Sequence, residues 1–149
     1  QEMGLRSGTE NLPGIAGFAA AVEYVYPRRA EIDKHIKALR ARLLARVAGM
    51  DEIVLNSPPD GAPHIVNLAV RGVRSQGLIN ALQDRDIYVS AGSACSKGHR
   101  SHVLEAMGVA PELIDGSVRV SLSDETTEDE IRTFAAALRD AAAALRPNR

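Results

Sequence analysis

The sequence predicts an α+β fold, in which helices pack on one small and mostly antiparallel sheet. Residues 117–123 read S-V-R-V-S-L-S, and this alternation of apolar and polar residues is typical of a strand with one buried face. Two further strand candidates, 51–55 and 64–70, follow each other with no helix between them. Apolar residues recur with helical spacing between residues 12 and 47 and again after residue 127. Adjacent strands beside helical crossovers favour the α+β class.

Two helices are predicted before the first strand, because apolar residues form two stripes with helical spacing. The first stripe is Ile15, Phe18, Val22 and Val25, and the second is Ile32, Ile36, Leu39, Leu43 and Val47. Pro27 lies between the stripes and predicts a break there. Asn11 can cap the first helix. The charged residues of 28–46 are expected on a solvated face.

Capping and turn residues predict the remaining elements. Ser75 is expected to cap a helix whose inner face holds Leu78, Ile79 and Leu82. Residues 87–91 predict a strand, residues 102–107 a short helix stopped by Gly108, and residues 111–114 a further turn. Thr127 and Glu130 form a capping box at the start of the last helix.

Composition and charge narrow the function classes. The 149 residues form one domain or one part of a larger chain, and 45% hydrophobic with 25% charged residues is an ordinary globular composition. A net charge of −1 gives no reason to expect nucleic acid or an anionic membrane surface. No apolar run is long enough to span a membrane. The single cysteine excludes an internal disulfide, no cluster has metal-ligand spacing, and both facts suit a cytoplasmic protein.

The single cysteine, Cys95, lies in the run V-S-A-G-S-A-C-S-K-G-H-R-S at residues 89–101. Its small and polar neighbours indicate a solvent-reached loop. Basic residues nearby could favour the thiolate, the nucleophilic form of cysteine; they are Lys97, His99, Arg100 and His102. A lone cysteine is also commonly a small buried hydrophobe. A reactive thiol and a structural one are both open at this point.

Arg119 and the segment before residue 12 are candidate binding residues. Arg119 shares the polar face of its predicted strand with Ser121 and could clamp a carboxylate through two parallel hydrogen bonds. An arginine on a wet sheet face is the alternative. The free N–H groups of the first helix start, with the Thr9 hydroxyl and the Arg6 charge, suit a phosphate. A plain N-cap and entry loop is the alternative there.

Three segments together resemble the C-terminal portion of a cysteine desulfurase, in the class V aminotransferase family of pyridoxal-phosphate enzymes. They are R-S-G-T-E-N-L-P-G at 6–14, V-S-A-G-S-A-C-S at 89–96, and S-V-R-V-S-L-S with T-T-E-D-E-I at 117–131. The resemblance implies that residues 1–149 are the single small C-terminal domain of a fold-type I pyridoxal-phosphate enzyme, without its large cofactor-binding domain. The chain starts at Gln1, directly on a motif-like run, as we expect of a fragment.

The resemblance also implies a role for three residues. Cys95 would be the nucleophile that takes sulfur from a cysteine–cofactor adduct, leaving alanine and a Cys95 persulfide for iron–sulfur cluster or thio-cofactor assembly. Arg119 would bind the carboxylate of the L-cysteine substrate. Thr9 would reach the phosphate of pyridoxal 5'-phosphate in the partner subunit of a homodimer. A sulfur-acceptor scaffold protein is the other implied partner.

Two departures from the family pattern affect these expectations. Five residues separate Cys95 from Ser101, which is fewer than in the long-loop members. The lysines are Lys34, Lys37 and Lys97, and none lies in the Ser-x-His-Lys type motif that holds the cofactor in the family. The chain by itself is therefore expected to be inactive. A selenocysteine lyase or another class V pyridoxal-phosphate enzyme is one alternative, and a truncated, non-enzymatic sulfur carrier or interaction domain acting through Cys95 is another.

Overall fold

The structure, a computed structural model, describes residues 2–5, 7–91 and 100–146. The chain divides into two compact units, Gln1–Asp33 and Lys34–Arg149. The predicted α+β class is confirmed, since helices pack on a three-stranded antiparallel sheet in the described part of the second unit. No helix among the described residues is both long and apolar enough to cross a membrane. In chain order the elements are η1 (Glu2–Gly4), α1 (Leu12–Val25), η2 (Tyr26–Arg28), α2 (Arg29–Val47), β1 (Ile53–Leu55), β2 (Ile65–Val70), α3 (Ser75–Gln83), α4 (His102–Ala106), α5 (Pro111–Asp115), β3 (Ser117–Ser121) and α6 (Glu128–Leu145).

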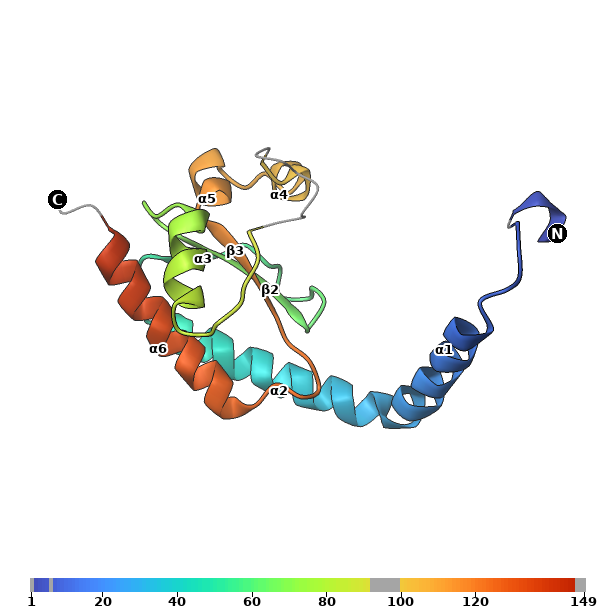
Figure 1. Cartoon of the computed structure of the whole chain (residues 1–149). Coiled ribbons are helices and arrows are strands. Elements are labelled where there is room, and N and C mark those ends of the chain that lie inside the picture. Colours follow the sequence, from blue (N-terminus) through green and yellow to red (C-terminus); the bar gives the residue numbers. More distant parts are fainter. Residues whose placement is uncertain (1, 6, 92–99, 147–149) are drawn as a thin grey trace. The chain divides into compact units, whose positions relative to one another are not determined.

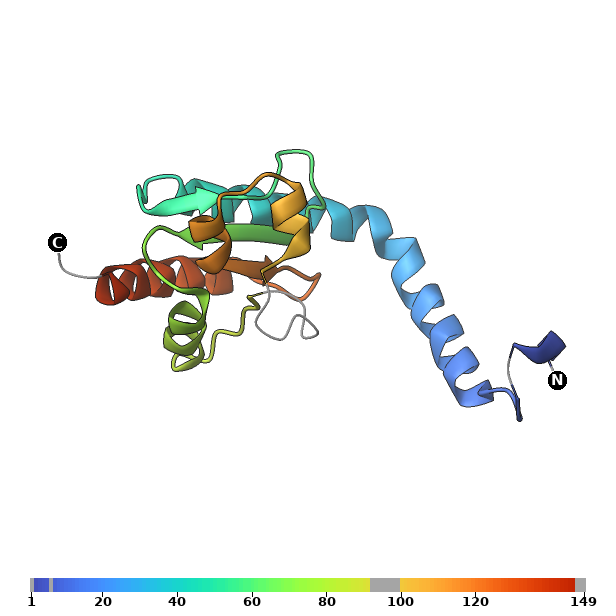
Figure 2. The same ribbon diagram turned by 90° about the horizontal axis from the view of Figure 1, so that it is seen from above.

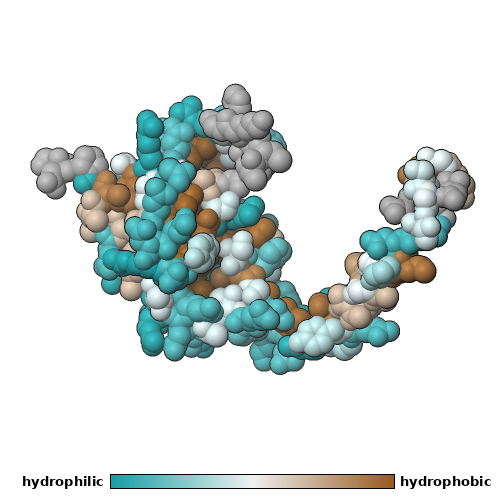
Figure 3. All heavy atoms as spheres, viewed as in Figure 1, coloured by the Kyte–Doolittle hydropathy of each residue, from teal (hydrophilic) through white to brown (hydrophobic). Residues whose placement is uncertain are grey.

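Helix α1 of the first unit begins as the sequence predicts but buries none of its residues. The Gly14 N–H donates to Asn11 Oδ1 over 3.2 Å. A Cβ on Gly14 would lie 2.5 Å from the Asn11 side-chain nitrogen, so a glycine is what allows this cap. The predicted apolar stripe is open to solvent, with Phe18 74% exposed (Figure 3). The predicted break at Pro27 is confirmed, because η2 separates α1 from α2.

The sheet of the second unit has the order β1-β2-β3, and its two faces differ in chemistry. Val66 pairs with Val120 and Leu68 with Val118, and all four are buried. They form the core with the buried stripes of α2 and α6. Figures 1 and 2 show these two helices along one face of the sheet and α4 and α5 along the other. The opposite face carries the polar pair of Asn67 and Arg119, and it is the face that holds the candidate site.

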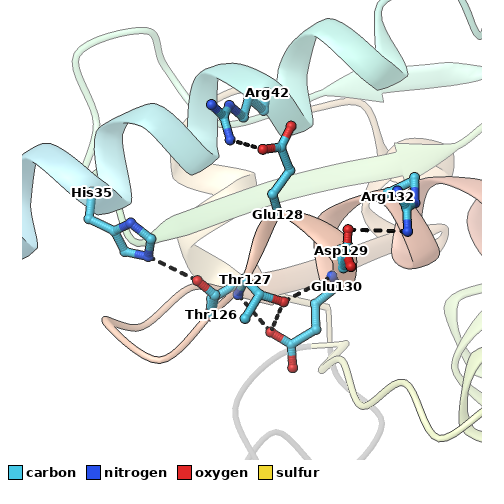
Figure 4. A network of polar contacts seen from close by, with 8 residues as sticks. All are labelled: His35, Arg42, Thr126, Thr127, Glu128, Asp129, Glu130 and Arg132. Atoms are coloured by element: carbon cyan, nitrogen blue, oxygen red, sulfur yellow. Dashed lines mark hydrogen bonds and ion pairs between the residues drawn. The ribbon is translucent and has the colours of Figure 1, made fainter.

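The start of α6 is fixed by the predicted capping box and by two side chains of α2 (Figure 4). The Glu130 N–H donates to Thr127 Oγ1 over 3.2 Å, and the Thr127 N–H donates to Glu130 Oε2 over 2.7 Å. The Thr127 N–H and the Thr127 hydroxyl both donate to the Glu130 carboxylate, and these two hydrogen bonds lower the pKa of Glu130. His35 Nε2 donates to the Thr126 carbonyl over 2.9 Å, and Arg42 pairs with Glu128.

One charged residue of α2 departs from the predicted solvated face. Arg40 is buried, and only 7% of it is exposed. Its Nη1 donates to the Ile65 carbonyl over 2.7 Å and its Nη2 to the Pro58 carbonyl over 3.0 Å. A buried guanidinium is tolerated when its donors are satisfied. Arg40 therefore ties α2 to the connection between β1 and β2.

Two local predictions are also wrong. Ser75 is the first residue of α3, and the N-cap is Arg74, which makes no side-chain capping bond. Residues 87–91 do not form a strand; they contribute only an isolated bridge between Ser90 and Arg119. Asp86 has a positive φ of 58°, and an open pocket separates residues 87–89 from the end of β3. Within residues 87–91, the chain thus meets the edge of β3 at Ser90 only.

Candidate functional site

An open pocket of about 310 Å³ lies on the polar face of the sheet, next to α4. The connection after β1 provides one wall, β2 and β3 provide the floor, and the start of α4 provides the other wall. Most of the lining area is apolar, and polar side chains come from all three parts of the lining: the connection after β1, the sheet and the start of α4. The lining residues are Asn56, Ser57, Pro58, Ile65, Asn67, Ala91, Ser101, His102, Val103, Leu104, Met107 and Arg119.

Arg119 is the positively charged group that β3 brings to this pocket. The alternation of β3 places it on the exposed face while Val118 and Val120 are buried, as the sequence predicts. Its N–H donates to the Ser90 carbonyl over 2.6 Å, and its carbonyl accepts the Ser90 N–H over 3.2 Å. Its guanidinium has no hydrogen bond or ion pair among the residues that the structure describes. A fixed backbone with an uncompensated guanidinium over a pocket suits a carboxylate ligand.

Thr9, the predicted phosphate contact, lies in the first unit in the exposed loop before α1. It follows Gly8, whose φ of +97° favours glycine. Asn11 caps the helix two residues later. Thr9 therefore lies two residues before the N-cap of α1, and its contact with a phosphate stays a prediction. Arg6, its predicted companion, lies outside the described residues.

Cys95, with Lys97 and His99, also lies outside the described residues, but both flanks of its segment are described. Upstream, Ser90 bonds to the backbone of Arg119. Downstream, Arg100 makes a bidentate pair with Asp115, with both N···O distances 2.7 Å. This pairing raises the pKa of Arg100 and lowers the pKa of Asp115. The charge of Arg100 is thus compensated by Asp115, and the predicted effect of Arg100 on Cys95 stays a prediction.

The described pocket does not form a holding site for pyridoxal phosphate. Among the described residues, its lining contains no lysine to bind the aldehyde and no carboxylate to pair with the ring nitrogen. Lys34 and Lys37 are exposed on α2 and do not line the pocket. The described residues therefore offer a guanidinium that could bind a carboxylate, but no group that could attach the cofactor.

Asn67 and Asn56 are pocket residues to which the sequence argument gave no role. Asn56 Nδ2 donates to Asn67 Oδ1 over 2.8 Å, and the Asn67 N–H donates to Ser57 Oγ over 2.7 Å. The available indication was an asparagine in the middle of the apolar run H-I-V-N-L-A-V. A polar residue at such a position needs partners, which points to a polar face on that strand.

Comparison with known proteins gives consistent matches. The family model described as Aminotransferase class-V matches residues 1–134. A NifS/IcsS protein homolog of Lactobacillus delbrueckii subsp. bulgaricus is 37% identical over 141 residues, which cover 92% of this chain and 37% of that protein. A cysteine desulfurase IscS of Serratia proteamaculans is 40% identical over 133 residues, covering 87% of this chain and 32% of that protein. A solved NifS-like protein superposes with a TM-score of 0.84 at 33% identity, over 97% of this chain and 37% of that one. The chain spans about a third of the length of the curated relatives it matches.

Proposed function

Because the chain belongs to the class V aminotransferase family, we propose that it is the C-terminal part of a cysteine desulfurase. Its similarity to proteins named cysteine desulfurase supports this activity. The observation that carries the proposal is Arg119, whose guanidinium lies on a stiff strand at the edge of a pocket and has no partner among the described residues. Such a group fits the carboxylate of an amino-acid substrate.

In this proposal Cys95 is the acceptor of sulfur. Its thiolate forms an S–S bond with the sulfur of L-cysteine while the Cβ–S bond of the substrate breaks. The electron pair of that bond stays on Cβ, which takes up a proton and leaves as alanine, and Cys95 keeps a persulfide. Ser90 supports this role, since it ties the upstream flank of the cysteine segment to the backbone of Arg119.

Pyridoxal phosphate, when bound, supplies the electron sink for such chemistry. Its attachment lysine is proposed to lie in the part of the relatives that this chain does not span. Thr9 is proposed to contact the cofactor phosphate in the partner subunit of a homodimer. A scaffold protein for iron–sulfur cluster or thio-cofactor assembly is proposed as the sulfur acceptor, in the cytoplasm.

The test uses the parent protein that contains this chain, supplied with pyridoxal phosphate and L-cysteine. Alanine release is measured together with the mass of the peptide that bears Cys95. The parent is expected to release alanine and to gain one sulfur on Cys95, and C95A is expected to lose both. Retained alanine release from L-cysteine in C95A would contradict the role of Cys95. Retained release from selenocysteine alone would favour the selenocysteine lyase alternative.

Arg119 is tested beside an arginine outside the pocket. R119A removes two hydrogen bonds to a carboxylate and is expected to raise KM for L-cysteine roughly 100-fold. R119K keeps the charge but not the bidentate geometry, so an intermediate KM is expected. Arg139 is exposed on α6, and R139A serves as the control. Equal KM values for R119A and R139A would contradict the carboxylate role.

A further inference from the structure

Asn67 lies directly across from Arg119 in the ladder between β2 and β3. The N–H and carbonyl of Arg119 bond to Ser90, on the side away from β2. Asn67 and Arg119 are therefore a non-hydrogen-bonded antiparallel pair, the kind in which Cα atoms approach to about 4.5 Å and side chains are closest. Both side chains leave the sheet on the same face, and both line the pocket.

The amide of Asn67 is held in one orientation by its neighbours. Its Oδ1 accepts the Asn56 Nδ2–H over 2.8 Å. Its backbone N–H donates to Ser57 Oγ over 2.7 Å, and its carbonyl accepts the N–H groups of Asn56 and Ser57 over 2.9 and 3.2 Å. The Nδ2 group makes no hydrogen bond within the described ranges. Asn67 thus presents a fixed donor, which loses little side-chain freedom on binding.

We propose that Asn67 is a second residue that binds the substrate carboxylate, with its Nδ2 donating to one carboxylate oxygen while the Arg119 guanidinium holds the carboxylate charge. This inference rests on the proposed function. A guanidinium alone holds the carboxylate in place but does not determine how the substrate is rotated about that group. A second donor on the neighbouring strand selects one rotation, and with it the direction in which the Cβ and sulfur of the substrate point.

The deciding variant is Asn67→Asp in the parent protein. Aspartate has the same shape, keeps an oxygen that accepts from Asn56, and replaces only the NH₂ by a second oxygen. It therefore converts the donor into a negative charge beside Arg119 while preserving the packing. Asn67→Ala removes the donor without adding charge. Asn80→Asp is the matched control, because Asn80 is exposed on α3 and does not line the pocket.

KM for L-cysteine is compared with the inhibition constant of cysteamine, which has the amine and thiol of cysteine but no carboxylate. N67A is expected to raise KM for L-cysteine about tenfold, the loss typical of one hydrogen bond to a charged group. N67D is expected to raise KM at least a further tenfold, because its carboxylate pairs with Arg119 and repels the substrate carboxylate. In N67A, the cysteamine constant is expected to stay within twofold of the unsubstituted value.

Two results would overturn the inference. One is a KM in N67D within twofold of that in N80D. The other is a cysteamine constant that rises in parallel with KM in N67A, since a collapsed pocket affects both ligands alike. Thermal unfolding of each variant identifies loss of fold. If N67A does not fold, the comparison of KM between N67D and N80D decides the test. A parent protein that releases no alanine from L-cysteine would overturn the proposed function and this inference with it, whereas normal turnover with an unchanged KM in N67D overturns the inference alone.

Discussion

Substituting Arg40 tests whether a buried guanidinium holds the wall of the candidate pocket. Arg40 is 7% exposed, and its hydrogen bonds of 2.7 and 3.0 Å end on the carbonyls of Ile65 and Pro58. Both of these residues line the pocket. Loss of Arg40 would leave the Ile65 carbonyl without this donor, leave the Pro58 carbonyl with the Gly61 N–H, and create a cavity where the side-chain stem packed. The connection between β1 and β2 would lose its tie to α2.

The magnitude follows from these contacts. A hydrogen bond to a charged group contributes about 1.5–3 kcal/mol, so two bonds give roughly 3–6 kcal/mol before any offset. Removing the guanidinium also removes the desolvation cost of burying its charge, and this offsets part of the loss. R40A is therefore expected to lower the free energy of unfolding by about 2–4 kcal/mol. R40M keeps most of the stem volume and is expected to cost less, about 1–3 kcal/mol for the lost hydrogen bonds to the Ile65 and Pro58 carbonyls.

Urea unfolding of the 149-residue chain measures these differences as shifts in midpoint at constant slope. Arg42 provides the control, because it lies on the same helix but pairs with Glu128 at the surface, where both side chains are 51% exposed. R42A is expected to cost less than about 1 kcal/mol. A cost of R40A within about 0.5 kcal/mol of that of R42A would show that the carbonyl bonds do not stabilise the fold.

Three further predictions concern stability. A Cβ on Gly116 would lie 2.6 Å from a backbone carbonyl oxygen, so G116A is expected to cost at least about 1–3 kcal/mol in urea unfolding, and an unchanged midpoint would contradict it. Phe18 is 74% exposed and Leu43 is fully buried; F18A is therefore expected to cost less than about 0.5 kcal/mol and L43A about 2–5 kcal/mol, and equal costs would contradict the burial argument. The folded pKa of Glu130 lies below its ordinary 4.5, so its carboxylate contributes stability above pH 4.5 that is lost as the pH falls through the folded value. Unfolding measured between about pH 3 and 6 is expected to depend less on pH in E130Q, and identical profiles would exclude this contribution.

The order of elements and their boundaries could largely be predicted from local chemistry. The capping residues Asn11 and Thr127, the break at Pro27 and the alternation around Arg119 act within a few residues of the chain. Cap geometry, proline sterics and the two-residue period of a strand are properties of the backbone itself. The exposed position of Arg119 on its strand could therefore be predicted before any packing was known.

Tertiary structure decided which of these residues meet. Arg40 is buried because carbonyls 18 and 25 residues away in sequence accept its hydrogen bonds, and no local pattern on α2 distinguishes it from Arg42. Residues 87–89 have the composition of a strand, but only Ser90 reaches the edge of β3. The pairing of Asn67 with Arg119 depends on the register between two strands about fifty residues apart in sequence. Register and burial depend on how whole elements pack, because a shift of one residue moves every side chain to the other face. The sequence alone thus determined the face of the sheet on which Arg119 lies, and the packing of the sheet against α4 decided that this face forms a pocket with Asn67 beside it.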